Sequence, residues 1–399
     1  MTKAVWILIN PSHYHVIRAK AFNSKKDIEL QIIQLRNVDA DFPELLSQNF
    51  NEIKLHTIFS GDDYLNYSKK YVSNLIFKKL NEINPDIVLV NGWSIGGSTD
   101  AICWSALNNK KSIILSESNV FDFQRNFFKE WIKKRIISYT HGAIVGGINA
   151  FEYIHSLGMP KSLIVNYLNI VDNFHFSKKT KSYYQNKSIK YLNKKKVFLS
   201  AGRFIEKKNH LNMMRAFLFF LKQKNFNSEW VLIILGDGPL MNKYQSFIKK
   251  NNLKDFIFLK GSIKYTELPM WYQRADCFIH PSKTEQWGLV INEAMSAGCP
   301  ILASNMVGSS KSLVQESING FLFEPLSIES ILSKLNLISK LDTMKLNQMG
   351  NQSLVIIKNY NQINLSTNFS KLLDKIKLIK TVSKISFFDY LIFYFLRGR

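Results

Sequence analysis

The alternation between short apolar runs and amphipathic segments of helix length constrains the fold of this chain more than any other feature. Segments such as Val72–Glu82 and Asp100–Asn108 have the length and pattern of helices. Strands that alternate with helices predict βαβ units around a parallel sheet. In the first half of the chain, the runs expected to form strands are Ala4–Ile9, Leu30–Gln34, Ile53–Phe59, Ile87–Val90, Ser112–Leu115, Ala143–Val145 and Leu163–Val165.

The alternation occurs twice, with a lysine-rich stretch between its two halves. It resumes with the runs Val197–Ser200, Trp230–Leu235, Ile257–Leu259, Cys277–His280 and Pro300–Ala303. We therefore expect an α/β protein with two Rossmann-like domains whose parallel sheets face a central cleft. The expected divisions are a first domain at 1–176, a basic linker at 177–196, a second domain at 197–365, and C-terminal helices at 366–399. These last helices would pack back on the first domain or on a membrane surface.

The composition limits the class of protein. A hydrophobic content of 46% is enough to build cores for both domains. Cys103, Cys277 and Cys299 lie far apart and form neither a disulfide framework nor a metal-ligand pattern, which fits a reducing cytosol. The first apolar run is too short for a secretory signal, and no run reaches the roughly 18 apolar residues of a membrane span. We expect a cytoplasmic protein that is either soluble or peripheral to the inner face of the membrane.

The charge of the chain is unusually positive. It has 53 Lys and Arg against 30 Asp and Glu, a formal net charge of +23. Such an excess favours anionic partners, which could be nucleic acid, acidic lipid or phosphorylated small molecules. Part of the excess can also be compositional bias, because Lys, Asn and Ile are all abundant.

Two strand ends in the second half carry the first candidate site residues. Gly202 follows a predicted strand and begins a short loop that contains Arg203 and Lys208. Two cations beside a strand end suit the diphosphate of a nucleotide, although a lysine-rich loop can also be a solvated surface. At the next strand end, Gly236 allows a tight turn or a close approach of the backbone to a ligand.

The segment His280–Pro300 is the most informative part of the sequence. Glu285 lies on the loop before a predicted helix, and Glu293 lies about one turn inside that helix, so both carboxylates can face one cleft. Free backbone N–H groups near Gly288 and Leu289 would suit an anionic phosphate. Glu285 could instead interact only with the positive end of the helix dipole.

These segments, taken together and in this order, resemble the family 4 glycosyltransferases, which are retaining enzymes with the GT-B fold. The resemblance includes Gly-Arg-(x)4-Lys at Gly202–Lys208, Gly-Asp-Gly-Pro at Gly236–Pro239, E-x7-E at Glu285–Glu293, and Asn319–Phe323. It spans about Val197 to Pro325. One departure is Gly308–Ser312, where many members of the family carry Gly-Gly-x-x-Glu.

The resemblance implies a role for each matching residue. Arg203 and Lys208 would hold the donor diphosphate and stabilise it as the leaving group, and Glu285 would contact hydroxyls of the donor sugar. No metal or other cofactor and no protein nucleophile would be required. The remaining donor contacts implied are the ribose diol at Glu293, backbone amides from Gly288 through Leu289 to Val290, and the base near Ile263 and Lys264.

The first half resembles the family only in general plan. The stretch Asn10–Arg18 is expected to form a loop after the first strand, which makes His13, His15 and Arg18 candidates for contact with donor phosphate or acceptor. Histidines in a loop can equally be incidental. At other strand ends, Trp93 is a candidate for the acceptor pocket, and Glu117 or Asn119 would occupy the space where family members often place a histidine.

Two segments combine aromatic residues with basic ones. Phe121–Ile137 interleaves phenylalanines and a tryptophan with lysines and arginines, as in helices that lie on anionic membranes. Ile385–Leu396 is strongly apolar but too short to span a bilayer. Either segment could instead pack against the first domain. Together with the net charge, they favour an enzyme that acts on a lipid-linked glycan.

The function expected from the sequence is sugar transfer in cell-surface polysaccharide synthesis. A retaining hexosyltransferase would move a sugar from a nucleoside-diphosphate-sugar donor to a glycan or a lipid-linked glycan acceptor. One alternative is a basic nucleic-acid-binding protein, which is less favoured because no known nucleic-acid motif occurs in the chain. Another is a sugar-nucleotide epimerase or a phosphorylase on the same fold.

Overall fold

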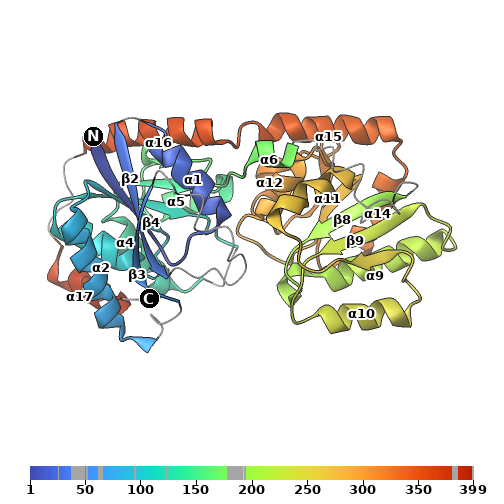
Figure 1. Cartoon of the computed structure of the whole chain (residues 1–399), viewed down its shortest axis with the longest axis horizontal. Coiled ribbons are helices and arrows are strands. Elements are labelled where there is room, and N and C mark those ends of the chain that lie inside the picture. The colour runs from blue at the N-terminus through green and yellow to red at the C-terminus, as the bar shows by residue number, and fades with distance from the viewer. Residues whose placement is uncertain are drawn as a thin grey trace. The chain divides into compact units, whose positions relative to one another are not determined.

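The computed structural model describes residues 1–25, 27–36, 50, 53–61, 66–93, 96–121, 125–177, 192, 195–379 and 385–397. The chain divides into two compact units (Figure 1), which we call the N-terminal and the C-terminal unit. The N-terminal unit comprises Met1–Ile170 and Gln362–Arg399, and the C-terminal unit comprises Val171–Asn361. Most of the expected linker, residues 178–191, 193 and 194, lies outside the described residues.

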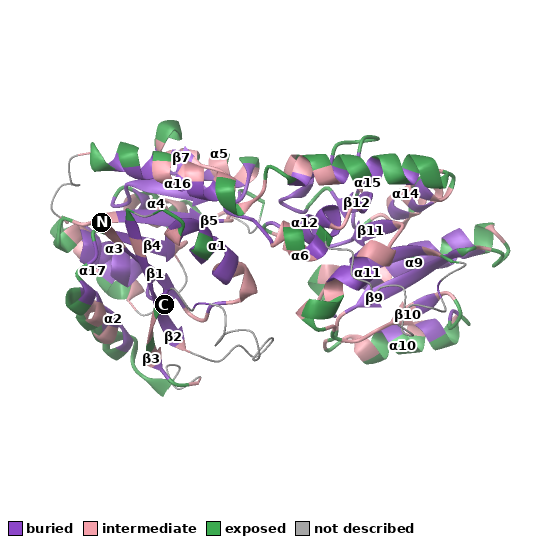
Figure 2. Ribbon diagram, turned by 45° about the horizontal axis from the view of Figure 1, so that its top comes forward, coloured by how far each residue is buried: buried purple, intermediate pink, exposed green. Residues whose placement is uncertain are grey.

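The N-terminal unit is built on a seven-stranded sheet in the order β3-β2-β1-β4-β5-β6-β7. Each neighbouring pair of strands is parallel, as the alternation of strands and helices predicted. The strands are mostly buried beneath more exposed helices (Figure 2). Their bounds are β1 Thr2–Leu8, β2 Ile28–Arg36, β3 Lys54–Phe59, β4 Ile87–Asn91, β5 Lys111–Ser116, β6 Gly142–Val145 and β7 Ile164–Val165.

Helices cover both faces of this sheet because the side chains of its strands alternate in direction. Val5 and Ile7 of β1 belong to a core with α2 (Lys69–Ile83), α3 (Ser98–Leu107), α4 (Phe127–Ile137), α5 (Ile148–Ser156) and α17 (Phe387–Leu396). Trp6, between them, contacts Phe22 of α1 (His13–Asn23), which in turn contacts Phe369 of α16 (Gln362–Lys377). A short helix, η2, spans Lys161–Leu163.

The C-terminal unit has a six-stranded parallel sheet in the order β10-β9-β8-β11-β12-β13. Its strands are β8 Lys196–Ala201, β9 Trp230–Leu235, β10 Ile257–Leu259, β11 Cys277–His280, β12 Ile301–Ser304 and β13 Gly320–Phe323. One core joins the sheet to α9 (His210–Gln223), α10 (Met241–Lys250), α14 (Ile328–Ser339) and α15 (Thr343–Ile357). The other helices are α6 Asn173–Ser177, η3 Glu206–Lys208, η4 Tyr265–Glu267, α11 Leu268–Arg274, α12 Leu289–Ser296 and α13 Ser310–Leu313.

The prediction of a loop over Asn10–Arg18 is wrong, because α1 begins at His13. Ser12 is the N-cap of this helix, and its Oγ lies 2.8 Å from Nδ1 of His15. The Ser12 N–H also donates to the same Nδ1, at 3.0 Å. These contacts cap the start of α1, and His13, His15 and Arg18 all lie on this helix.

Candidate active site

The candidate site lies at the carboxyl ends of β8, β9 and β11, where loops connect the strands to the following helices. Gly202 at the end of β8 donates its N–H to Leu235 O, at 3.0 Å. Gly236, at the end of β9, has φ +131°, and a Cβ there would lie 2.1 Å from Gly202 O. Glycine at position 236 therefore allows the two strand ends to approach each other closely.

Glu285 is the centre of a polar cluster at this edge of the sheet. Its Oε1 accepts from Lys208 Nζ at 2.5 Å, and its Oε2 lies 2.6 Å from His280 Nε2. Ser282 Oγ also donates to Oε2, at 3.1 Å. Burial alone would raise the pKa of Glu285, but its interactions with His280 and Lys208 hold that pKa well below the usual range. Glu285 is therefore an ionised carboxylate with a fixed orientation.

His280 is a buried hydrogen-bond partner of Glu285. The imidazole is 1% exposed. Burial lowers the pKa of His280 more strongly than Glu285 raises it, so the ring is neutral near pH 7. Nε2 then donates its hydrogen to Glu285, and among the described residues Nδ1 has no hydrogen-bond partner. The pair is thus a hydrogen bond from a neutral imidazole to a carboxylate rather than an ion pair.

Two groups near this cluster remain available to an anion. The side chain of Arg203 is exposed, and its guanidinium forms no hydrogen bond or ion pair with a described residue. Helix α12 begins after Gly288, at φ +93°, with no side-chain cap. Within the described part of the chain, the N–H groups of Leu289 and Val290 have no hydrogen-bond acceptor. A guanidinium and free helix N–H groups both favour phosphate.

Glu293 lies on α12, but in a different environment from Glu285. Its side chain is 2% exposed, and Tyr272 Oη donates to its Oε2 at 2.7 Å. The two glutamates therefore have different hydrogen-bond partners. Glu285 contacts Lys208, His280 and Ser282, whereas Glu293 contacts Tyr272. Among the other predicted donor contacts, Ile263 is half-buried, and Lys264 is exposed and precedes η4.

The loop that carries Glu285 is held by Gly308. This residue lies in Gly308–Ser312, where the sequence departs from the pattern of the family. Gly308 donates its N–H to Glu285 O at 2.9 Å, and a Cβ on Gly308 would lie 1.7 Å from Gln286 O. Sequence reasoning missed this support and the roles of His280 and Ser282. A signal was present, because the run His280-Pro281-Ser282 ends β11 directly before Glu285.

In the N-terminal unit, the structure brings together two of the predicted residues. Arg18 is 6% exposed and donates through Nη2 to Glu117 Oε1 at 3.1 Å and to Asn169 Oδ1 at 2.7 Å. The sequence analysis did not single out Asn169. His15 is occupied in the cap of α1, and burial, followed by the charges of Arg18 and His13, lowers its pKa to about 3.

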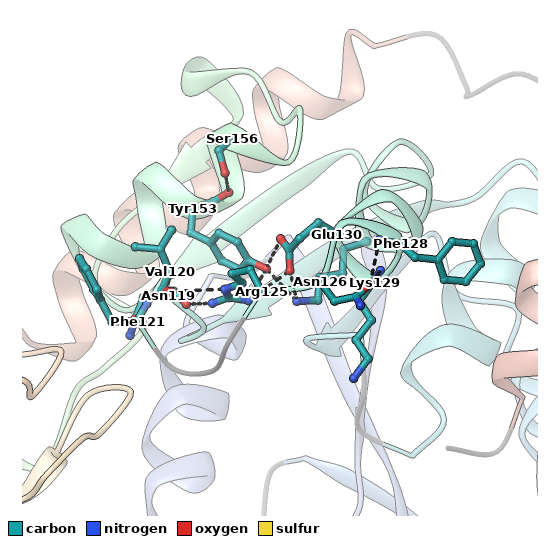
Figure 3. A network of polar contacts seen from close by, with 11 residues as sticks. Asn119, Val120, Phe121, Arg125, Asn126, Phe128, Lys129, Glu130, Tyr153 and Ser156 are labelled. Carbon is teal, nitrogen blue, oxygen red and sulfur yellow. Dashed lines mark hydrogen bonds and ion pairs between the residues drawn. The ribbon is translucent and has the colours of Figure 1, made fainter.

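The other predicted residues of this unit take part in local packing. His13 contacts the neighbouring Tyr14 ring, with the ring centroids 3.8 Å apart. Trp93 packs edge-on to Tyr153 at 6.0 Å and lies beneath the ammonium of Lys133. Asn119 is 3% exposed, and its Oδ1 accepts from Phe121 N–H at 2.8 Å. Figure 3 shows the network around Asn119, in which Arg125 donates to Asn119 O and Tyr153 Oη.

Among the described residues, no group of three or more His, Cys, Asp or Glu side chains is placed to hold a metal ion. Within the same residues, no helix has both the length and the apolar character needed to cross a membrane.

Comparison with known proteins identifies the family of the C-terminal unit. Residues 184–354 match the model of the family described as "Glycosyl transferases group 1". This segment, somewhat less than half of the chain, is thus similar to a group 1 glycosyl transferase domain. The matched residues contain the Glu285 cluster, and the match confirms the predicted resemblance to the family 4 type of glycosyltransferase. The E-x7-E motif itself stays a prediction.

Two curated proteins are similar to part of this chain. Protein CapJ of Staphylococcus aureus is 30% identical over 50% of this chain and 51% of its own length. A UDP-Gal:alpha-D-GlcNAc-diphosphoundecaprenol alpha-1,3-galactosyltransferase of Escherichia coli is 33% identical over 45% of this chain and 44% of its own length. The chain thus matches about half the length of these relatives.

The fold of this chain is also found in solved structures. Anabaena HepE in complex with UDP has a TM-score of 0.74 and 16% identity, and the match covers 94% of this chain and 100% of HepE. At this level of identity the likeness concerns the fold alone. It confirms the predicted GT-B fold, in which two α/β units each have a parallel sheet.

Proposed function

We propose that this protein is a retaining glycosyltransferase that uses a nucleoside-diphosphate-sugar donor. Its acceptor would be a glycan or a lipid-linked glycan in cell-surface polysaccharide synthesis. The observation that carries the proposal is the Glu285 cluster, which lies within the group 1 segment and includes Lys208 from the same loop as Arg203.

The charges of the cluster suit a diphosphate leaving group. In the absence of donor, Lys208 is paired with Glu285 at 2.5 Å, and Arg203 has no ion pair with a described residue. A bound diphosphate would offer both cations a stronger anion, and their attraction would increase as charge develops on the leaving oxygen. This interaction stabilises the transition state for departure without a metal ion. We expect turnover to persist in EDTA.

Glu285 would bind the donor sugar. As an ionised carboxylate with one oxygen turned to Lys208 and the other to His280, it can accept hydrogen bonds from sugar hydroxyls in a defined orientation. In a retaining reaction with front-face attack, no protein nucleophile is needed. The main contribution of Glu285 would therefore be to position the sugar. Glu293 is proposed to hold the ribose, which requires the donor to reach the carboxylate now bonded to Tyr272.

The remaining proposed contacts line the same strand ends. Gly202 and Gly236 permit close approach of backbone to the diphosphate, and the amides from Gly288 to Val290 would meet sugar and phosphate. Ile263 and Lys264 would lie near the base. UDP is the first nucleotide to test, because HepE binds it and the E. coli relative is named for a UDP-sugar.

The acceptor and the location of the protein are proposals of the same kind. The name of the E. coli relative specifies a diphosphoundecaprenol-linked acceptor, which supports a lipid-linked glycan for this chain. Such an acceptor would be reached from the cytoplasmic face of the membrane. We therefore propose a cytoplasmic protein, peripheral to the inner face.

Thermal-shift measurements with UDP, GDP, ADP, CMP and dTDP at moderate salt test the donor site. Selective stabilisation by one nucleoside diphosphate is expected, and it should be lost in Arg203→Ala and in Glu293→Ala. The matched control is Arg215→Ala, because Arg215 is also exposed on this unit and, among the described residues, hydrogen-bonds only to Asn212 on the same helix. Indiscriminate stabilisation by polyanions, with no nucleotide effect, would favour the nucleic-acid-binding alternative.

A second assay tests the reaction. Labelled sugar should pass from the stabilising donor to a lipid-linked acceptor, and NMR of the product should show the anomeric configuration of the donor. Inversion would contradict the retaining mechanism. Epimerised donor without transfer would favour an epimerase, and a requirement for inorganic phosphate would favour a phosphorylase.

A further inference from the structure

The outer face of α17 is aromatic and exposed. Phe387, Phe388, Tyr394 and Phe395 are 79%, 57%, 45% and 71% exposed, and their spacing places them on one side of the helix. The opposite side carries Phe393, which is 2% exposed and belongs to the core of the N-terminal unit. A helix with large aromatic side chains turned to solvent is unusual for a soluble surface.

This helix is firmly attached, because a buried carboxylate joins it to α4. Asp389 is 1% exposed and accepts from Arg135 Nε at 2.7 Å, with a second bond from Arg135 Nη2. Tyr139 Oη and Ser386 Oγ donate to the same carboxylate, at 2.7 and 2.6 Å. These bonds fix which side of α17 is buried. The aromatic side of α17 therefore faces solvent because the opposite side is held against the N-terminal unit.

The start of α4 extends the same apolar surface. Phe127 and Phe128 are 87% and 65% exposed. Phe128 stacks on Trp131 at 5.9 Å, and Trp131 meets Phe388 of α17 at 5.7 Å, so a line of rings joins the two helices. We call the exposed residues of this region the α4–α17 surface: Phe127, Phe128, Phe387, Phe388, Tyr394 and Phe395.

The charges around the α4–α17 surface are mainly positive. Lys129 and Lys134 are exposed on α4, and Figure 3 shows Phe128 and Lys129 directed away from the Arg125–Glu130–Tyr153 network. Glu130, the one acidic residue of α4, is paired with Arg125 at 3.3 Å and Lys133 at 2.7 Å. The one acidic residue of α17, Asp389, is buried. No uncompensated carboxylate of these helices opposes an anionic partner.

We propose that the α4–α17 surface docks on an anionic lipid bilayer. Aromatic rings prefer the interface between headgroups and acyl chains, and neighbouring lysines are attracted to anionic headgroups. With ten residues, α17 is too short to cross the hydrocarbon core and would lie in the plane of the interface. The surface belongs to the N-terminal unit alone and involves none of the donor-site residues.

Co-sedimentation of the full chain with lipid vesicles tests the proposal. We expect binding to vesicles of phosphatidylcholine with 30% phosphatidylglycerol, at least about tenfold weaker binding to phosphatidylcholine alone, and weakening in 0.5 M salt. The double variant Phe387→Ser/Phe395→Ser should lose about tenfold or more in partition coefficient. The control, Phe219→Ser/Phe226→Ser, replaces aromatics of the C-terminal unit that are 46% and 41% exposed, and it should bind vesicles as the unmodified protein does.

A charge variant separates the two contributions. Lys129→Glu/Lys134→Glu should remove the preference for phosphatidylglycerol while thermal stability remains near that of the unmodified protein. The Phe387→Ser/Phe395→Ser and Lys129→Glu/Lys134→Glu variants should both retain the thermal shift with nucleoside diphosphate. This result distinguishes failure at this surface from failure of the proposed function.

Two outcomes would overturn the proposal. One is a folded monomer that binds neither kind of vesicle. The other is a dimer, detected by light scattering, that the Phe387→Ser/Phe395→Ser variant abolishes while vesicle binding is absent. In that case the α4–α17 surface would be an interface between two copies of the chain.

Discussion

The two units share a parallel α/β plan but use the charged residues at their strand ends differently. In the C-terminal unit, Lys208 and Glu285 are paired at the edge of the sheet, and Arg203 forms no ion pair with a described residue. In the N-terminal unit, Arg18 is buried and bonded to Glu117 and Asn169. An arginine that follows a strand is thus exposed in one unit, at Arg203, and buried in the other, at Arg18.

The comparison also indicates where the chain is similar to its family. The group 1 match, at residues 184–354, falls wholly in the C-terminal unit. Donor recognition is the property expected to be shared within such a family, whereas acceptors differ. Substitutions of equivalent type in the two units should therefore have effects of different kinds, on turnover in one and on stability in the other.

The largest effect is expected for Glu285→Gln. We expect kcat/KM to fall by about 10²–10³, because the amide removes the negative charge that orients Lys208 and weakens acceptance from sugar hydroxyls. Steady-state transfer assays at several donor concentrations measure it. Glu229→Gln is the control, since Glu229 is exposed and its one ion pair with a described residue is that with Lys196, at 3.1 Å. Turnover within twofold of the unmodified protein in folded Glu285→Gln would remove Glu285 from the site.

A pair of glycine substitutions compares the strand ends of the two units. In Gly236→Ala, the new Cβ would lie 2.1 Å from Gly202 O, at a φ of +131°, so the backbone must shift. We expect a loss of about 3 kcal/mol in unfolding free energy and weaker nucleotide binding. Gly92, at φ +64° after β4, has open space around a Cβ, so Gly92→Ala should cost only about 1 kcal/mol.

Denaturant unfolding of both variants gives these values. Equal losses would mean that the two strand ends are equally tolerant, and the contrast between the units would not extend to their backbones. A large loss in Gly236→Ala with unchanged nucleotide affinity would separate the close approach of Gly202 and Gly236 from donor binding.

Arg18→Ala tests whether the N-terminal cluster is structural. We expect it to lower the unfolding free energy by about 2–3 kcal/mol, since Glu117 and Asn169 lose their shared donor. The estimate is at the low end for a buried pair because Glu117 is 29% exposed. Nucleotide affinity, measured by calorimetry, should be unchanged. Unchanged stability with lost affinity would instead make Arg18 a donor contact.

Much of the fold could be predicted from the sequence, because buried parallel strands are nearly continuous apolar runs. Cys277–His280 coincides with β11, and Ile87–Val90 falls one residue short of β4. Helix α1 was missed, since its start depends on the mutual contacts of Ser12 and His15 rather than on an apolar stripe.

The candidate site was less predictable, because its contacts join distant parts of the chain. The spacing around Glu285 was visible in the sequence, and so was the loop that carries Lys208. Their 2.5 Å contact, over 77 positions, depends on the neighbouring places of β8 and β11 in the sheet. The bond of Arg18 to Asn169 spans 151 positions and depends on the fold of the whole N-terminal unit.

The smallest expected effect concerns a histidine beside the donor site. His210 is 1% exposed, and neither ring nitrogen has a hydrogen-bond partner among the described residues. Burial first, and then interactions with His280 and Lys208, lower its pKa to about 3. The unfolded chain binds a proton near pH 6.5, so this histidine stabilises the fold above that pH and progressively less below it.

Between pH 7 and pH 5, this linkage should remove about 2 kcal/mol of unfolding free energy. In His210→Leu the loss should be smaller by that amount, because the titrating group is gone. Denaturant unfolding at the two pH values measures it, with Met213→Leu, at a fully buried position of the same helix, as the control that keeps the full loss. An undiminished loss in His210→Leu would mean that His210 gains a proton in the folded state as readily as in the unfolded chain. The imidazole would then be accessible to solvent or ligand, and His210 would join Arg203 among the accessible groups of the C-terminal unit.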